Sequence, residues 1–501
     1  MPFTQRSAAV DAFLMSEPGS FIDGKAVRGT AGETIVVIDP ATEEELASIE
    51  AAGAKEVDAA VAAARRSFDD RRWRGLAPQA RRDILWKLGD LIAARANELA
   101  ELDVLDNGMP LAFAKWEMSA CTEWLRHFAG QAAQIHGINA SAALSGGGTD
   151  IHAYTSVQPV GVAALIVPWN APTGNMMIKL APALATGCSV IIKPAEETPL
   201  TSTIIAQLCL EAGVPEGVVN VVVGTGREAG ARLAAHPGVD KVSFTGSTAT
   251  GKAIVAAAAG NLKRVTLELG GKSPVIVCDD ADLDLAIPAV ANAIFANSGQ
   301  ICFAGSRLFV HSRVYDKVIE GVAEFAKGLK IGNGFDPSTN LGPLISGKQR
   351  DQVTRYLESG RTSGGQIVTG GTAPTGPGFF VEPTVFANVA QDREIAREEI
   401  FGPVLVATPF DDLDVVVGLA NDTRYGLGSG VFTRDVNKVH WLAGRIDAGN
   451  VWVNTYGITH PAMPFGGMKE SGWGREMSSD VLDAYTEKKS VFVALSSPVG
   501  Q

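Results

Sequence analysis

The segments VTLELGGKSP (residues 265–274) and NSGQICFAGSR (residues 297–307) decide how this chain folds and what chemistry it can perform. In the first, the carboxylate of Glu268 ends an apolar, strand-like run, and a Gly-Gly turn follows it. In the second, the single thiol of Cys302 lies in a loop of small and polar residues. A thiol nucleophile with a carboxylate base in reserve predicts covalent catalysis.

The totals describe an acidic globular chain. With 501 residues it is too long for one hydrophobic core, so we expect two or three domains. Apolar residues make up 46% and charged residues 20%, as in ordinary globular proteins. A formal charge of −12 repels nucleic acid and anionic membranes, so we expect neither as a partner.

The cysteines are odd in number, widely spaced and without a Cys-x-x-Cys pair, so we expect neither a disulfide framework nor a metal site. The N-terminus has no basic and then apolar signal, and no apolar run approaches the ~20 residues of a membrane helix. We therefore expect a reduced, cytoplasmic protein. The cysteines are Cys121, Cys188, Cys209, Cys278 and Cys302, of which we expect the first four to be structural.

Short apolar runs alternate with helix-like segments in two successive units. Alternation of this length predicts parallel sheets covered by helices on both faces, an architecture that binds dinucleotides at the carboxyl ends of its strands. The expected strands of the first unit are residues 161–167, 189–193, 218–223, 241–244 and 265–268. The second unit starts at residue 274, with helices over 283–297 and 315–329 and strands at 274–277, 308–310, 401–407 and 451–454.

Amphipathic helices precede the first unit. They begin near Ala54, are broken at residues 107–110, and continue in a helix that carries Trp116, Trp124 and Phe128, which we expect in the core.

A hairpin pattern between residues 134 and 160, with a turn at 145–148, has no obvious core to cover it. The run at residues 489–495 has the same character. A projecting arm that meets a partner subunit is the favoured interpretation, and a plain edge hairpin is the alternative.

Two glycine patterns compete for a phosphate-binding role. Residues 223–230 follow a strand, but their spacing is loose. Residues 244–251 join a strand to a helix, where backbone amides and the Ser247 hydroxyl could meet a pyrophosphate. For either pattern, a structural turn without a ligand remains an alternative.

The Glu-Leu-Gly-Gly-Lys-Ser-Pro box at residues 268–274 and the Gly-Gln-x-Cys loop at residues 299–302 resemble the signatures of the aldehyde dehydrogenase superfamily, and the resemblance covers nearly the whole chain. It implies an α/β fold with a Rossmann-type NAD-binding domain (residues 1–133 and 160–269) and an α/β catalytic domain (residues 270–477). It also implies a small β oligomerisation arm and tail (residues 134–159 and 478–501) in a homodimer or homotetramer.

The resemblance also implies catalytic roles. Cys302 would attack the aldehyde, Asn170 and the Cys302 amide would bind the oxyanion, and Glu268 would activate water against the thioester. Lys179 and Glu476 match positions that assist proton relay.

For the cofactor, the resemblance implies NAD in preference to NADP, because a ribose-binding carboxylate repels a 2′-phosphate. Lys193 and Glu196 would hold the adenosine ribose, and Glu399 the nicotinamide ribose. The other cofactor positions are Trp169, Gly246, Ser247, Gly251, Leu269 and Phe401.

Several substrate-wall positions that the family often fills with large aromatic residues are small here, which favours a bulky or apolar aldehyde that is aromatic, terpenoid or long-chain. These positions are Ala171, Ile178, Ala296 and Thr459. Phe303 runs against that trend. The alternatives are a CoA-acylating or semialdehyde dehydrogenase of the same superfamily, or a non-catalytic structural or binding protein on this fold. The wall positions are Trp124, Ala171, Asn175, Ile178, Ala296, Ile301, Phe303, Ile458 and Thr459.

Overall fold

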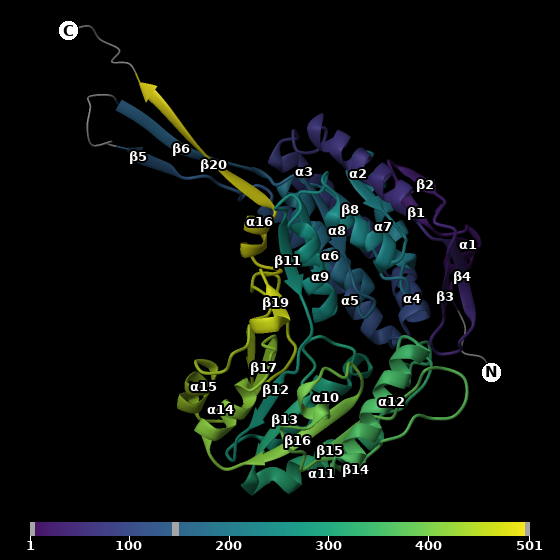
Figure 1. Cartoon of the computed structure of the whole chain (residues 1–501), viewed down its shortest axis with the longest axis vertical. Helices are drawn as coiled ribbons and strands as arrows, with labels where there is room; N and C mark the ends of the chain where they lie inside the picture. Colours follow the sequence, from purple (N-terminus) through teal and green to yellow (C-terminus); the bar gives the residue numbers. More distant parts are fainter. Residues whose placement is uncertain (1–5, 143–149, 496–501) are drawn as a thin grey trace.

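The computed structural model describes residues 6–142 and 150–495, which form two α/β units and a projecting arm (Figure 1). The eight-stranded sheet of the first unit has the order β19-β11-β10-β7-β8-β9-β1-β2, with parallel pairing from β11 to β9. The expected parallel strands are therefore confirmed. Their bounds are β7 Val162–Ile166, β8 Ser189–Lys193, β9 Val219–Val221, β10 Lys241–Thr245 and β11 Arg264–Glu268. The other strands are β1 Ser20–Ile22 and the two edge strands, β2 Lys25–Val27 and β19 Gly472–Trp473.

Strand alternation gives this sheet two separate apolar faces. On β7, Ala163 and Leu165 pack in the cluster of α5, α6 and α7, whereas Ala164 and Ile166 pack in the cluster of α2, α8 and α9. The sheet is thus buried on both sides. The helices are α2 Ala54–Asp69, α5 Leu111–Gln131, α6 Pro172–Thr186, α7 Leu200–Ala212, α8 Ala231–Ala235 and α9 Thr248–Ala258.

The region before α5 departs from expectation in two places. The single predicted helix before residue 107 is two helices, α3 Pro78–Ala94 and α4 Ala96–Asn107. The predicted break is confirmed at Gly108, whose φ of 87° suits glycine. Core placement is right for Trp124 and wrong for Trp116, which is 55% exposed. The remaining N-terminal elements are α1 Ala8–Met15, β3 Thr34–Ile38 and β4 Glu45–Glu50.

The second unit is a seven-stranded sheet with the order β14-β15-β16-β13-β12-β17-β18, parallel except for β14. Its strands are β12 Pro274–Val277, β13 Arg307–His311, β14 Gln366–Thr369, β15 Thr384–Ala387, β16 Val404–Phe410, β17 Gly428–Phe432 and β18 Asn450–Val453. Its helices are α10 Leu283–Phe295, α11 Tyr315–Gly328, α12 Gly347–Thr362, α13 Glu394–Arg397, α14 Leu413–Asn421 and α15 Val436–Ala443.

The chain crosses back near its end. β19 pairs antiparallel with β11, so residues 472–473, expected within the catalytic domain, add an edge strand to the first sheet.

The arm is a three-stranded antiparallel sheet that extends away from both units (Figure 1). β6 pairs with β5 on one side and with β20 on the other, so the hairpin and the C-terminal run join as one element. The expected turn at residues 145–148 and the tail after residue 495 lie outside the described residues. The strands are β5 Asn139–Ala142, β6 Asp150–Pro159 and β20 Thr486–Leu495, which follows α16 Asp480–Ala484.

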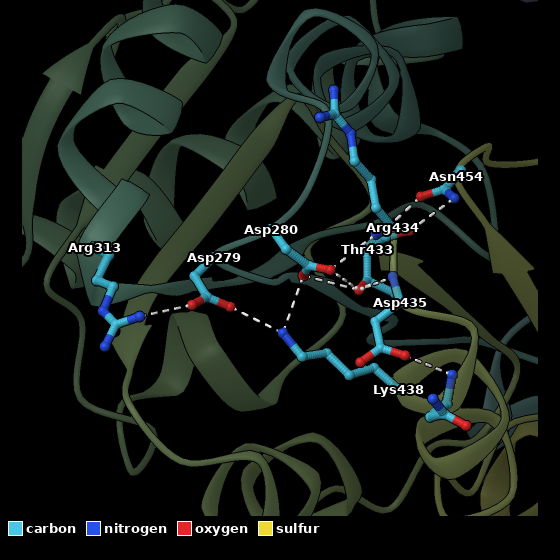
Figure 2. Close-up of polar contacts among 9 residues, drawn as sticks. Asp279, Asp280, Arg313, Thr433, Arg434, Asp435, Lys438 and Asn454 are labelled. Atoms are coloured by element: carbon cyan, nitrogen blue, oxygen red, sulfur yellow. Dashed lines mark hydrogen bonds and ion pairs between the residues drawn. The ribbon is translucent and has the colours of Figure 1, made fainter.

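A polar network closes the carboxyl ends of β12 and β17 (Figure 2). Lys438 contacts Asp279 at 2.9 Å and Asp280 at 3.1 Å, and Asp280 accepts a hydrogen bond from Thr433. This end of the second sheet is therefore locked by charge, and the nucleophile lies at the opposite end, where β13 begins. Within the described residues, no helix is both long and apolar enough to cross a membrane.

Candidate active site

The candidate site lies where the carboxyl ends of β7, β10 and β11 meet the amino ends of β12 and β13. Two cavities open there, and three residues line both of them: Asn170, Thr245 and Cys302. A thiol at such a junction is accessible from both sides, so one cavity can hold a cofactor and the other a substrate.

The loop that carries the nucleophile has an unusual backbone. Asn297 (φ 46°) and Ser298 (φ 56°) are left-handed, and Gly299 (φ 72°) follows them. Consecutive non-glycine residues in this region are held only where the surroundings fix them. Asn297 Nδ2 donates to the carbonyl of Asn170 at 2.8 Å, and Asn170 Nδ2 donates to the carbonyl of Gln300 at 2.8 Å. Asn170 therefore anchors the loop by two reciprocal bonds.

The Gly-Gly turn allows two other parts of the site to approach closely. A Cβ at Gly270 would lie 2.1 Å from Glu399 Oε2, and one at Gly271 would lie 2.4 Å from the Cys302 carbonyl oxygen. The Gly271 amide donates to Glu399 Oε1 at 2.9 Å. Larger residues here would push apart the nucleophile loop and the Glu399 carboxylate.

Cys302 is protonated in this environment. Burial raises the pKa of its thiol far above the usual range, and the carboxylates of Glu268 and Glu399 raise it further. The thiol must therefore lose its proton before the sulfur can act as a nucleophile.

Glu268 is a buried carboxyl close enough to Cys302 for its charge to act on the thiol. It is 4% exposed, and Oε2 has no hydrogen-bond partner among the described residues. Burial raises the pKa of this carboxyl well above 4.5, the charge of Glu476 adds to the shift, and Lys179 opposes it. A general base near neutrality is favoured by such a shift.

Lys179 and Glu476 form a buried ion pair with Nζ and Oε1 2.6 Å apart. The Ser243 hydroxyl donates to the same oxygen at 3.2 Å. Both sequence-predicted relay residues therefore lie together beside Glu268 and outside either cavity.

The first cavity, of about 260 Å³, suits a dinucleotide. The rings of Trp169 and Phe401 stand perpendicular at a centroid distance of 5.2 Å, and Phe401 has a φ of 56°. Ser247 caps the eleven-residue helix α9, whose amino end faces anions favourably. The predicted residues that line this cavity are Trp169, Gly246, Ser247, Leu269, Glu399 and Phe401.

The three other predicted cofactor residues lie beside this cavity. At the end of β8, Lys193 Nζ is 3.1 Å from Glu196 Oε2, and Glu196 Oε1 accepts from the Gly226 amide at 2.5 Å. A Cβ at Gly251 would lie 2.7 Å from the Leu269 side chain, so glycine there lets α9 pack closely. These residues provide charged and hydroxyl-binding groups that fit an adenosine ribose.

The second cavity, of about 270 Å³, is mainly apolar. Eight of the nine predicted wall residues line it. The exception is Ile458, whose side chain is 64% exposed and whose carbonyl accepts from Trp452 Nε1, so the structure does not place it in the wall. The eight are Trp124, Ala171, Asn175, Ile178, Ala296, Ile301, Phe303 and Thr459.

Sequence reasoning missed part of this wall. On α5, Phe113 and Trp116 line the cavity with Trp124, and spacing of three and eight residues on one helix face could have revealed them. Phe465 and Met477 close it from the C-terminal crossing segment, and no local pattern marks them. In the cofactor cavity the missed residues are Pro168, Thr245, Gly270, and Gln349 and Gln352 of α12.

A buried thiol between two cavities, one of them mainly apolar, with a buried carboxyl nearby, fits a thiol-dependent oxidoreductase. The aldehyde dehydrogenase family model matches residues 27–491, and this chain belongs to that family. The expected enzyme class and fold are thereby confirmed.

Relatives match over almost the whole chain. Aldehyde dehydrogenase 1 of Tanacetum cinerariifolium is 45% identical and covers 94% of both chains. The phenylacetaldehyde dehydrogenase of Pseudomonas fluorescens is 43% identical and covers 95% of both. The NAD+ complex of the aldehyde dehydrogenase from Bacillus cereus superposes with a TM-score of 0.96 at 44% identity, over 98% of this chain and 99% of that one.

Proposed function

We propose that this enzyme oxidises bulky, apolar aldehydes, with aromatic aldehydes as the preferred class. The observation that carries this proposal is the aromatic wall around Cys302. Phe113, Trp116 and Trp124 come from one side of the cavity, and Phe303, Tyr456 and Phe465 come from the other. Aromatic side chains favour flat apolar groups through both buried area and ring contacts. The relative that acts on phenylacetaldehyde supports the same class.

The cofactor is NAD. Among this chain's residues, Glu196 would bind the adenosine ribose with Lys193, and its carboxylate would repel the 2′-phosphate of NADP. Glu399 would bind the second ribose, since the Gly271 amide already holds one of its oxygens. The bound nicotinamide supplies the hydride acceptor.

In the first half of the reaction, the Cys302 thiol gives its proton to solvent water, Sγ forms a bond to the aldehyde carbon, and the electron pair of the carbonyl double bond moves to the aldehyde oxygen. The charge that develops on the aldehyde oxygen needs fixed donors. Asn170 uses one amide hydrogen on Gln300, which leaves its second hydrogen for the oxyanion. Hydride departure from that carbon leaves a thioester on Cys302.

In the second half, Glu268 takes a proton from water as the water oxygen attacks the thioester carbon. The Cys302 thiolate then leaves, and the carboxylic acid is released. Because Glu268 is buried and its pKa is raised, it is a stronger base than an exposed carboxylate.

NADH formation with a panel of aldehydes tests the proposal. Wild type should prefer benzaldehyde and phenylacetaldehyde to acetaldehyde in kcat/KM. Cys302→Ala should abolish NADH formation, and Glu268→Gln should give a burst of one NADH per subunit followed by slow turnover. Cys209→Ala is the matched control, because that thiol is buried in α7 away from both cavities.

A preference for acetaldehyde would contradict the substrate class. Turnover that depends on added CoA would instead indicate the acylating alternative.

The arm supports an assembly. Strand β20 carries three apolar residues that are 40% to 65% exposed: Phe492, Val493 and Leu495. An exposed apolar strand of this kind is typical of a surface that packs against another subunit. We therefore retain a homodimer or homotetramer, in a cytoplasmic location, as a proposal.

A further inference from the structure

One polar stripe inside the first sheet is not explained by the reaction steps above. On β10 and β11, alternate residues face α6, because Val242 and Phe244 pack on the opposite face. The residues facing α6 include Lys241 and Ser243, and Thr266 pairs in register with Ser243. Polar residues at these buried positions run from the start of β10 toward Glu268 at the end of β11.

These side chains form a continuous hydrogen-bonded wire. Lys241 Nζ donates to Thr266 Oγ1 at 3.0 Å, and the Thr266 hydroxyl donates to Ser243 Oγ at 3.2 Å. The Ser243 hydroxyl in turn donates to Glu476 Oε1 at 3.2 Å. Every donor in the wire points toward Glu476, which is the arrangement that a proton shift requires.

The wire is shielded from solvent. Lys241, Ser243 and Lys179 are 0% exposed, Glu476 is 2% exposed and Thr266 is 9% exposed. Lys241 has no ion-pair partner within 4 Å among the described residues, and its Nζ lies 4.6 Å from the centre of the Tyr485 ring. A buried lysine without a carboxylate partner loses its proton readily.

Several charged and titratable groups face Lys241. The pKa of Lys241 is lowered to about 7, mainly by burial and in smaller part by the charges of Lys179 and Arg264. Glu476 and the Cys188 thiol act in the opposite direction. The ammonium and amine forms are therefore both accessible at neutral pH.

We propose that Lys241 is a positioning residue for the dehydrogenase reaction, exchanging a proton with Glu476 through Thr266 and Ser243 and thereby setting the ionisation of Glu268. This inference rests on the function proposed above. Lys241 touches no reacting atom and acts through Glu476.

The proton shift balances along the wire. Lys241 gives one N–H proton to Thr266 Oγ1, Thr266 gives its hydroxyl proton to Ser243 Oγ, and Ser243 gives its proton to Glu476 Oε1. Each hydroxyl loses one proton and gains one, so only the ends change: the ammonium becomes an amine, and the carboxylate becomes a carboxylic acid. The reverse shift restores both.

The proton shift from Lys241 to Glu476 affects Glu268 because it changes the charge of the Glu476 carboxyl. The Glu476 carboxylate raises the pKa of Glu268, so neutralising Glu476 makes Glu268 easier to ionise. With the proton on Glu476, Glu268 is ready to accept one from water. With the proton on Lys241, Glu268 retains its own.

Four variants test the wire from both ends. Lys241→Met removes the exchanging group, and Lys241→Arg keeps a positive charge that cannot deprotonate. Ser243→Ala and Thr266→Val each break one link. The matched control is Ser189→Ala. Ser189 lies on β8 of the same sheet, and its hydroxyl forms a buried hydrogen bond with the Ser67 hydroxyl of α2.

The readouts are the NADH burst, kcat and the pH profile of kcat. We expect Lys241→Met, Lys241→Arg, Ser243→Ala and Thr266→Val to keep a burst of one NADH per subunit. Their kcat should fall about tenfold, less than the roughly 10²- to 10⁴-fold loss that follows removal of a group that transfers the proton itself, and the acidic limb should be displaced. Ser189→Ala should match wild type, and thermal midpoints identify variants that fail to fold.

Two results would overturn the inference. Full activity in Lys241→Arg would show that a fixed charge suffices, and wild-type kcat and pH profile in Ser243→Ala and Thr266→Val would show that the links carry nothing. If the Lys241 variants do not fold, the two link variants decide alone. Absence of NADH formation by wild type with every aldehyde would instead contradict the proposed function.

Discussion

The side-chain amide of Asn170 donates to the carbonyl of Gln300 at 2.8 Å, and this bond joins the end of β7 to the nucleophile loop. Asn297 returns a bond of equal length to the Asn170 carbonyl. The residue proposed to bind the oxyanion thus also fixes the loop that carries Cys302, so donor and nucleophile keep one geometry throughout the reaction.

Replacing Asn170 with alanine should lower kcat/KM by about 10²- to 10³-fold, the usual effect of losing one oxyanion donor. Steady-state NADH formation measures this. Asn292→Ala is the control, because Asn292 lines the same cavity and has no assigned role in the reaction. A loss in Asn292→Ala as large as that in Asn170→Ala would count against a specific role for Asn170.

The pH profile of kcat should reflect the buried state of Glu268. Because burial raises the pKa of this carboxyl well above 4.5, its basic form is lost at a higher pH than that of an exposed glutamate. We therefore expect kcat to fall on acidification well before the pH reaches 4.5. In Glu268→Gln the residual turnover should lose this limb, and an unchanged limb would assign it to another group.

Local motifs allowed much of this site to be predicted. Glu268 ends a strand and Cys302 lies in a loop that contains glycines, so a short run of neighbouring residues identifies each of them as a candidate site residue. Trp116 was misplaced because its helix pattern cannot tell a cavity wall from a core. Phe465 could not be predicted at all, since it reaches the cavity only when the chain crosses back to pair β19 with β11.

The role proposed for Lys241 also could not be predicted from the sequence, because it depends on tertiary packing. In the sequence it is a lysine at the start of a strand, which usually means an exposed end. Only the packing of Tyr485 over it and its bond to Thr266 reveal that the Lys241 side chain is buried and hydrogen-bonded inside the sheet.

The ion pairs of Lys438 with Asp279 and Asp280 (Figure 2) should stabilise the fold between the acidic pH at which the aspartates become neutral and the alkaline pH at which the lysine becomes neutral. Lys438 lowers the pKa of both Asp279 and Asp280, and they raise the pKa of Lys438. The aspartates therefore add stability above their unfolded pKa of about 3.9, and this is lost as the pH falls through their lower folded values. The lysine contribution is present below its unfolded pKa of about 10.4 and is lost as the pH rises through the raised folded value.

Lys438→Met should accordingly lower the free energy of unfolding near neutral pH by about 1 kcal/mol. The difference from wild type should shrink in acid below about pH 4, where the aspartates become neutral. Denaturant unfolding at several pH values measures both effects. Lys327→Met removes an exposed pair with Glu324 and should change little; a pH-independent deficit in Lys438→Met would contradict the electrostatic account.

The exposed apolar face of β20 predicts a test of assembly. Phe492 is 65% exposed, so Phe492→Glu should leave the fold intact while placing a charge where a partner subunit is expected. We expect a smaller species by light scattering after size-exclusion chromatography. Leu262→Glu, at a site 88% exposed outside the arm, is the control. An unchanged mass for Phe492→Glu would argue against an interface on this strand.

The aromatic wall of the substrate cavity gives the sharpest test of specificity. Trp116 is 55% exposed yet lines the cavity, and its ring lies 5.5 Å from that of Phe113, so it can cover one face of a bound aromatic group. Trp116→Ala should raise KM for phenylacetaldehyde by about 10- to 100-fold, which is 1–3 kcal/mol of lost contact. It should leave the KM for acetaldehyde nearly unchanged, because a two-carbon substrate has no aromatic group for that ring to cover. Trp86→Ala, another exposed tryptophan outside the cavity, is the control. Equal losses for both aldehydes in Trp116→Ala would mean that the ring supports the fold of α5, and that the aromatic preference must come from Phe303 and Phe465 beside the nucleophile.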